Sequence, residues 1–234
     1  MLRYAVVGFI CLLAGNAQAQ QTPPSPQGAP ASPSSAAPVT PSKAVVVMET
    51  PLPGDHWTYE VRDEISGKIS ATREFVVTEV TPKEISLRFK NLSTSIEGFN
   101  VFDRSWNLMS AGQWKYSPND GTGVKTPLAV GKTWTFQSSD VNAGEGFGWN
   151  RSGSSKIVGQ ETMTTKAGTF ETFRIETTYS SRNIKDPTRK EEVVIQTWYA
   201  PAIDHWVKRT FISRVEKHLR VSNTIELIEY GRKG

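Results

Sequence analysis

The sequence contains a single cysteine, Cys11, and this residue lies inside the apolar run near the N-terminus. If that run is removed on export, the mature chain has no thiol, so disulfides and cysteine chemistry are excluded. The nucleophile motif Gly-x-Ser-x-Gly is absent, and the glycine-rich stretches lack the lysine and the strand-to-helix context of a phosphate-binding loop. We therefore predict a non-catalytic protein that uses no cofactor.

Blocks of like charge are also missing. The chain has 27 Lys and Arg against 23 Asp and Glu, a net charge of +4, and the two signs are interleaved. Nucleic-acid binding usually needs a concentrated basic face, so no nucleic-acid partner is expected. No apolar run beyond the first twenty residues reaches the roughly 20 residues that a membrane-spanning helix needs, so no transmembrane span is expected.

The first 19 residues have the three parts of a secretory signal peptide. Arg3 supplies a positive charge, AVVGFICLLA forms a short apolar run, and Ala17-Gln18-Ala19 provides small residues for cleavage. The predicted cut follows Ala19. This pattern predicts a periplasmic protein.

The next segment, residues 20–43, is rich in proline, alanine and serine. Seven of the 14 prolines lie here, and no charged residue occurs before Lys43. Such a segment has too little apolar area to bury, so we predict a disordered linker. The remaining residues, 44–234, are enough for a single β domain with its own core.

Residues 44–234 alternate apolar and polar side chains over many short segments. EISLRF (84–89), TFRIETTY (172–179) and LRVSNTIELIEY (219–230) each place large apolar residues on one face. This period of two is typical of half-buried antiparallel strands, and turn signals separate the segments. We predict an all-β fold, an antiparallel meander of about ten to twelve strands curled into an open barrel or half-barrel.

A weak internal repeat divides this domain. PLPGDHWTYEV at 51–61 matches PLAVGKTWTFQ at 127–137 in Pro-Leu and in Gly-x-x-Trp-Thr followed by an aromatic residue. The match predicts two similar halves, 51–126 and 127–234. The alternative, that the motif only marks two strand starts, stays open.

The segment TWYAPAIDHWVKRTF, residues 197–211, concentrates aromatic residues, a proline and two cations. Alternating residues before Pro201 indicate a strand, which ends there because proline cannot donate to a β-ladder. The residues after AID lead back as a second strand. We predict a hairpin whose cations, Lys208 and Arg209, stay hydrated.

The run Trp198-Tyr199-Ala200-Pro201, a short turn and Val207-Lys208 resembles a hairpin of an uncharacterised family of bacterial envelope domains. The upstream stretch IVGQETMTTKAGTFETFRIE is similar to that family's V-G-x-E-x-V-x-x-x-A-G-x-F hairpin. The resemblance covers roughly residues 125–215 and departs from the family at 203–206, where a small glycine-rich turn is usual. It implies a periplasmic all-β domain, distantly similar to the open barrels of the lipoprotein-carrier group, without catalytic residues.

The tripeptide Asp-His-Trp occurs twice, at 55–57 and at 204–206. If the two copies meet in the fold, His56 and His205 with their aspartates could ligate a metal ion. Neither pair has a regular ligand spacing. We therefore predict no metal site and favour turn-forming aspartates, each beside a surface histidine and a core tryptophan.

Two glycine-rich stretches, 112–121 and 139–153, carry aromatic and basic residues that a scaffold does not require. These candidate ligand-binding residues are Trp114 and Tyr116 in the first and Phe147, Trp149 and Arg151 in the second. We expect both stretches to be loops at the rim of the sheet. Their aromatic side chains would either plug the barrel or contact a ligand.

Three functions remain open from the residues alone. The first is a carrier that holds an apolar ligand such as a lipid in the concave face of the sheet, with Phe147 and Trp149 as a lid. The interior residues that would line it are Val77, Leu87, Phe89, Phe173, Ile175 and Leu227. The second is an envelope scaffold or protein-interaction domain with a solid core. The third is cell-wall glycan binding through the aromatic loops.

Overall fold

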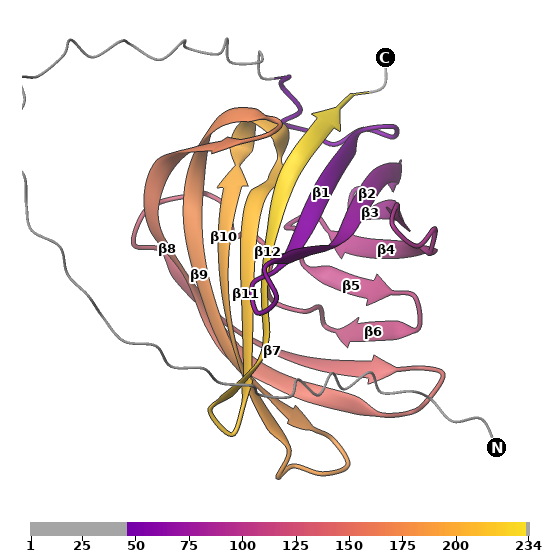
Figure 1. Ribbon diagram of the computed structural model, residues 1–234. Helices are drawn as coiled ribbons and strands as arrows, with labels where there is room; N and C mark the ends of the chain where they lie inside the picture. Colours follow the sequence, from indigo (N-terminus) through magenta and orange to yellow (C-terminus); the bar gives the residue numbers. More distant parts are fainter. Residues whose placement is uncertain (1–45, 233–234) are drawn as a thin grey trace, which may run out of the picture. The chain divides into compact units, whose positions relative to one another are not determined.

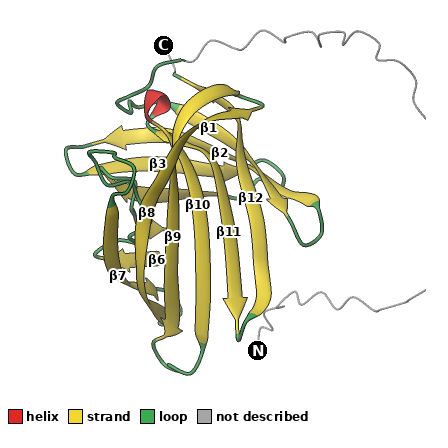
Figure 2. Ribbon diagram, turned by 90° about the vertical axis from the view of Figure 1, so that its left-hand side faces the viewer, coloured by secondary structure: helices red, strands yellow, loops and turns green. Residues whose placement is uncertain are grey.

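Twelve β-strands pair into one closed antiparallel barrel in the computed structural model, which describes residues 46–232 (Figure 1). Each strand pairs with the next along the chain, and β12 pairs with β1 to complete the circle. The strands are β1 (His56–Asp63), β2 (Lys68–Val80), β3 (Glu84–Asn91), β4 (Glu97–Asp103), β5 (Leu108–Ala111), β6 (Trp114–Ser117), β7 (Thr133–Asn142), β8 (Gly148–Thr165), β9 (Gly168–Asn183), β10 (Lys190–Ala200), β11 (His205–Val215) and β12 (His218–Gly231). A short 3-10 helix, η1 (Pro201–Ile203), joins β10 to β11 (Figure 2).

The predicted all-β antiparallel meander of ten to twelve strands is confirmed. The barrel is closed, whereas the sequence favoured an open barrel or half-barrel. Closure follows from the pairing of Trp57 with Tyr230 and of Tyr59 with Leu227, which brings the apolar faces of β1 and β12 together. The ladder is continuous around the barrel, so each of the twelve described strands has a paired strand on both sides.

The predicted signal peptide (1–19) and linker (20–43) lie outside the described residues, and both stay predictions. The two proposed halves contain β1–β6 and β7–β12, and β1 and β7 carry the matching Trp-Thr-aromatic stretches. A duplication of one half into the other likewise stays a prediction. Within residues 46–232 there is no helix long and apolar enough to cross a membrane.

The hairpin of β8 and β9 is the longest in the barrel and curves over one end of it (Figure 1). Its turn reaches β1, where Lys166 pairs with Glu60 at 2.6 Å. On the same hairpin, Phe170 packs edge-on against Tyr230 of β12, with ring centroids 5.5 Å apart. This curvature lets the hairpin contact strands that are not its neighbours in the sheet.

The predicted hairpin around Pro201 is β10, η1 and β11. Lys208 stays half-exposed with its ammonium 5.6 Å from the Trp198 ring centroid. The expectation for Arg209 was wrong. Arg209 pairs in register with Thr197 on the buried face of β10, and its guanidinium lies over the Trp206 ring at 4.1 Å. A bulge at Trp198/Tyr199 shifts the alternation and turns this cation toward the barrel interior.

The main core is an aromatic cluster built from β1, the β4–β5 turn and the start of β11. His205 stacks on Trp57 at 4.4 Å and meets Trp106 edge-on at 4.7 Å. Its Nδ1 lies 2.5 Å from the Tyr59 hydroxyl, and that hydroxyl donates to the Trp206 carbonyl at 2.8 Å. His205 is 1% exposed, so the prediction that it is a surface histidine was wrong. Burial lowers the pKa of His205 well below its ordinary value and keeps the ring neutral.

Trp57 should be the most costly single truncation in this cluster. Replacing a fully buried aromatic side chain by alanine removes its burial and leaves a cavity, so Trp57→Ala should lower the free energy of unfolding by about 3–5 kcal/mol. Phe99→Ala is the control, because Phe99 is 62% exposed, and it should stay within about 0.5 kcal/mol of wild type. Urea denaturation followed by far-UV circular dichroism measures both, and equal costs would contradict this account of the core.

Candidate functional site

The five predicted ligand-binding residues come from two strands, β6 and β8, and from the turn between β7 and β8. Trp114 and Tyr116 lie on β6, Trp149 and Arg151 lie on β8, and Phe147 lies in the turn that precedes β8. The expectation that these residues sit on rim loops was wrong for four of them. In β8, a Cβ at Gly148 or at Gly153 would overlap a neighbouring residue, so glycine at these two positions makes room for that neighbour within the strand.

The strand register places these side chains on one face of the sheet. Tyr116 pairs with Asp140, and Asp140 pairs with Trp149. Arg151 pairs with Ser138, two residues before Asp140 on β7. Directly paired residues point to the same side of a sheet, so the four predicted strand residues and Asp140 converge on the barrel interior. Phe147 packs edge-on against Trp114, with ring centroids 5.3 Å apart.

A pocket of about 170 Å³ lies at this convergence. Its lining residues are Trp114, Tyr116, Asp140, Trp149, Arg151, Tyr179, Ser181 and Glu191. Four of the five predicted residues are therefore in the lining, and the fifth, Phe147, supports one of them. Whether the pocket holds a ligand stays a prediction.

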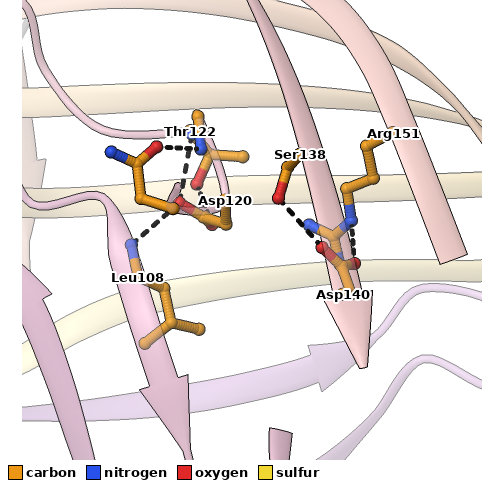
Figure 3. A network of polar contacts seen from close by, with 8 residues as sticks. Leu108, Asp120, Thr122, Ser138, Asp140 and Arg151 are labelled. Atoms are coloured by element: carbon orange, nitrogen blue, oxygen red, sulfur yellow. Dashed lines mark hydrogen bonds and ion pairs between the residues drawn. The ribbon is translucent and has the colours of Figure 1, made fainter. Parts of the chain in front are cut away.

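Two of the lining residues, Arg151 and Asp140, form an ion pair (Figure 3). Asp140 is 1% exposed and also accepts a hydrogen bond of 3.1 Å from the Ser138 hydroxyl. The Arg151 guanidinium lies 5.4 Å from the Tyr116 ring centroid and 5.0 Å from that of Tyr179. Two phenol rings thus flank the cation, an arrangement that stabilises it and fixes its plane.

The pocket has a defined charge state. Burial raises the pKa of Asp140 to about 6, against the opposing charge of Arg151. Burial also raises the pKa of Tyr116 and of Tyr179 to about 12, so both phenols keep their protons. For Arg151, burial acts to lower the pKa, but Tyr179 and Asp140 outweigh it and the pKa is raised. At neutral pH the pocket therefore presents a charged pair and two hydroxyl donors.

A second carboxylate, Asp120, lies close enough that its negative charge acts to raise the pKa of Arg151 and of Arg209. It accepts hydrogen bonds from the Leu108 amide at 2.8 Å and from the Thr122 hydroxyl at 2.6 Å (Figure 3). These bonds tie the turn after β6 to β5. Asp120 is 7% exposed and so is buried beside the pocket.

Sequence reasoning missed the acidic half of the site, which consists of Asp120, Asp140 and Glu191. One signal was present in the sequence for Asp140. It stands at an inward position of an alternating strand, two residues from Ser138, where a carboxylate is unexpected. The stretch 139–153 was instead interpreted as a loop, and that interpretation removed the alternation that would have placed Asp140 inside.

The two metal candidates do not share a ligand set. Among residues 46–232, no group of three or more His, Cys, Asp or Glu side chains is placed to hold a metal ion. The Asp-His-Trp copies do meet, but through stacking of Trp57 on His205. Asp55 instead pairs with Arg232 at 2.9 Å, and Asp204 accepts a hydrogen bond from the Tyr199 hydroxyl. His56 is half-buried beside Gly231.

The residues predicted to line an apolar cavity are mostly packed against other side chains. Val77, Leu87, Ile175 and Leu227 are at most 2% exposed and belong to the main core. Phe173 is half-buried and packs against that core. Phe89, also half-buried, contacts Phe75.

Comparison with known proteins identifies the fold. No protein-family model and no curated protein matches the sequence. Among solved structures, a provisionally assigned lipoprotein from Parabacteroides distasonis ATCC 8503 is similar, with a TM-score of 0.54 and 13% sequence identity. The match covers 79% of this chain and 99% of that one. The expected likeness to all-β envelope domains is thus confirmed at the level of the fold.

Two further solved structures match with lower TM-scores. A provisionally assigned exported protein with a YmcC-like fold from Bacteroides fragilis NCTC 9343 has a TM-score of 0.48 and 13% identity, over 81% of this chain and 100% of its own. The hypothetical lipoprotein YmcC from Escherichia coli K12 has a TM-score of 0.47 and 11% identity, over 76% of this chain and 85% of its own. Fold likeness at such identity says nothing of activity.

Gly153 should be needed for the geometry of the pocket. A Cβ at this position would overlap the Thr178 carbonyl oxygen and the Tyr179 Cβ, so Tyr179 would have to move off Arg151. Gly153→Ala should therefore lower the free energy of unfolding by about 1–3 kcal/mol. Gly159→Ala on the same strand is the control, because nothing lies within 4 Å of its Cβ, and it should be neutral or slightly stabilising. Thermal unfolding compares the two, and equal behaviour would contradict the crowding at Gly153.

Asp140 should make stability depend on pH in the acid range. Its pKa of about 6 in the fold lies above the ordinary 3.8, so the folded state holds this proton more tightly than the unfolded chain. The protonated Asp140 therefore stabilises the fold fully below about pH 4. This contribution is lost as the pH rises through about 6, which lowers the free energy of unfolding by roughly 3 kcal/mol. Asp140→Asn should remove this loss.

The measurement is urea denaturation of wild type and variant between pH 4 and pH 7. The stability of wild type relative to Asp140→Asn should fall as the pH rises, while Asp186→Asn, an exposed carboxylate in the β9–β10 turn, should track wild type. If stability changes with pH in the same way in wild type and in Asp140→Asn, the fold does not raise the pKa of Asp140.

Proposed function

We propose that this protein is exported to the bacterial envelope and binds there, without catalysis, a sugar ring of a cell-wall glycan in the pocket beside Arg151. The observation that carries the proposal is the convergence of Trp114, Tyr116, Trp149 and Arg151 on one pocket. Aromatic faces pack against the apolar face of a sugar ring, and a charged pair with two phenols supplies directional hydrogen bonds to its hydroxyls.

The size of the pocket favours a ring over an acyl chain. Its volume of about 170 Å³ lies below the roughly 300–1,000 Å³ of pockets that enclose whole drug-sized ligands. A single ring of a longer glycan needs less space, and the rest of the polymer can stay outside. A buried Arg–Asp pair also disfavours an apolar occupant, because covering it with an acyl chain would remove the remaining hydration of both charges.

The envelope location rests on two lines of support. The first 19 residues have the pattern of a secretory signal, followed by the proline-rich segment 20–43. The fold is similar to that of a protein described as a lipoprotein. A glycan ligand agrees with such a location, because cell-wall polymers lie in the same compartment.

A second candidate function, lipid binding, is favoured by a different groove. A groove of about 470 Å³ lies where the β8–β9 hairpin approaches η1, and its lining is mostly apolar. The lining residues are Val47, Gln160, Thr169, Phe170, Glu171, Thr172, Phe173, Pro201 and Ala202. Phe173 was already one of the predicted lipid-lining residues, and the volume falls in the range of ligand sites.

Glycan binding is tested with the N-acetylglucosamine–N-acetylmuramic acid disaccharide from peptidoglycan, titrated into the exported protein by isothermal calorimetry. Trp149→Ala should weaken binding by about threefold to tenfold, since one aromatic contact contributes about 0.5–1.5 kcal/mol. Phe99→Ala, an exposed aromatic on β4, should bind as wild type. No heat with wild type, or equal affinity of Trp149→Ala, would overturn the pocket as a glycan site.

The same preparation separates the two candidate functions. Native mass spectrometry of the protein purified from periplasm, with and without added fatty acid, shows whether a lipid is retained. A discrete added mass that is lost in a Phe170→Ser variant but kept in Trp149→Ala would favour the lipid groove. If the protein shows only its bare mass under both conditions and binds the disaccharide, lipid binding is ruled out and glycan binding is the one supported function.

A further inference from the structure

The outer face of β7, β8 and β9 carries a regular array of short hydrogen-bonding side chains. Register pairs Thr135 with Ser154 and Thr178 across the three strands, then Gln137 with Ser152 and Ser180, then Ser139 with Asn150 and Arg182. Each row runs across the strands, with neighbours about 4.8 Å apart. The array therefore consists of nine polar side chains in three rows, on the opposite face from the pocket.

These nine side chains have no partners within residues 46–232. None of them makes a hydrogen bond, an ion pair or a ring contact with another described residue. Elsewhere on the sheet some polar side chains are engaged, as where Thr162 bonds Glu171 or where Lys90 pairs with Glu97. The array thus offers free hydroxyl, amide and guanidinium groups to an outside partner.

The array is hollowed rather than flat. A groove of about 680 Å³ runs over β7, β8 and β9 from the end of β6, and its lining residues are Ser117, Pro118, Gln137, Ser138, Ser139, Asn150, Arg151, Ser152, Ser180 and Arg182. A second hollow of about 620 Å³ shares Gln137 and Ser152 with it and continues toward Thr135 and Ser154. Together they form one elongated trough large enough for several linked rings.

The charge of the trough has one sign. Its lining contains no Asp or Glu among the described residues and includes Arg182 on the outer face, whereas the side chain of Arg151 points to the barrel interior. Asp140 already neutralises Arg151, so Arg182, which is exposed, is the available cation. Large apolar side chains are also scarce there, and a protein partner would need them to form the core of an interface.

We propose that this trough binds an extended glycan strand that carries anionic groups. A polyhydroxylated polymer matches the rows of hydroxyl and amide groups, and its carboxylate or phosphate groups match Arg182. The proposal does not depend on the interior pocket, because the two sites lie on opposite faces of the β7–β8 sheet and share only Arg151.

The test measures retention of the whole exported protein in gels that contain polygalacturonate, neutral dextran or single-stranded DNA. Polygalacturonate should retain the protein most, because it supplies both hydroxyls and carboxylates. Arg182→Glu should weaken this retention at least about fivefold in low salt. Arg220→Glu is the matched control, since Arg220 is likewise an exposed strand arginine without a partner among the described residues, and it should behave as wild type.

A second pair of variants separates shape from charge. Ser152→Trp fills the middle of the trough without changing charge and should abolish retention by polygalacturonate. Ser70→Trp places the same bulk on an exposed serine of β2 and should have no effect. Circular dichroism confirms that each variant is folded before it is compared.

Three outcomes would overturn the trough as a glycan site. They are unchanged retention of Ser152→Trp, equal loss in Arg182→Glu and Arg220→Glu, and retention by DNA as strong as by polygalacturonate, which would indicate charge alone. Trp149→Ala keeps the two sites distinguishable. If that variant loses the disaccharide but keeps polygalacturonate, the pocket and the trough act separately; if wild type fails with the disaccharide but binds polygalacturonate, only the pocket proposal fails.

Discussion

The pairing of β1 with β12 is the constraint on which the rest of the structure depends. It joins residues 56–63 to residues 223–231, the two ends of the described sheet, and so gives the sheet an inside and an outside. Just before β1, the fully buried Asp55 accepts two hydrogen bonds of 2.9 Å from Arg232 and one of 2.9 Å from the Leu52 amide. This carboxylate holds the two ends of the described sheet against each other, and without that closure neither the aromatic core nor the pocket would be enclosed.

Once the barrel is closed, its interior divides into an apolar end and a polar end. Trp57, Trp106 and His205 fill the apolar end by direct ring contact. At the polar end Arg151 and Asp140 are paired, and the pKa of Asp140 remains raised to about 6, so the pair does not fully offset the desolvation of its own carboxylate. A buried ion pair of this kind contributes little to stability, and a well-packed apolar pair would fill the space as well. An ion pair that adds little stability agrees with the proposed binding site at this end of the barrel.

The alternation of side chains was enough to predict the fold class, the number of strands and the hairpin at Pro201, because period two is a local property of a strand. Closure could not be predicted, since it depends on the register between residues as distant as Trp57 and Tyr230. Of the residues in the site, only the aromatic ones and Arg151 were predicted, because large aromatic and basic side chains are unusual in a glycine-rich stretch. Asp140 was missed because the glycines of the following turn and of β8 led residues 139–153 to be interpreted as one loop, and a carboxylate's burial depends on partners that only the folded barrel supplies.

The glycines of β8 connect these observations. Gly153 has no side chain on the inner face, which gives Tyr179 the room to lie against Arg151. On the outer face, the same strand carries Asn150, Ser152 and Ser154, none of which is large enough to fill the hollow above it. The first half of β8, GWNRSGSS, is rich in glycine and serine and forms β-structure poorly by itself, so tertiary pairing with β7 and β9 must hold it in place. This composition weakens the strand, but it leaves room for Tyr179 on the inner face and a hollow on the outer face. For a sheet whose only task was to close a barrel, β-branched residues would serve better, and the hollow on the outer face agrees with the proposed glycan trough.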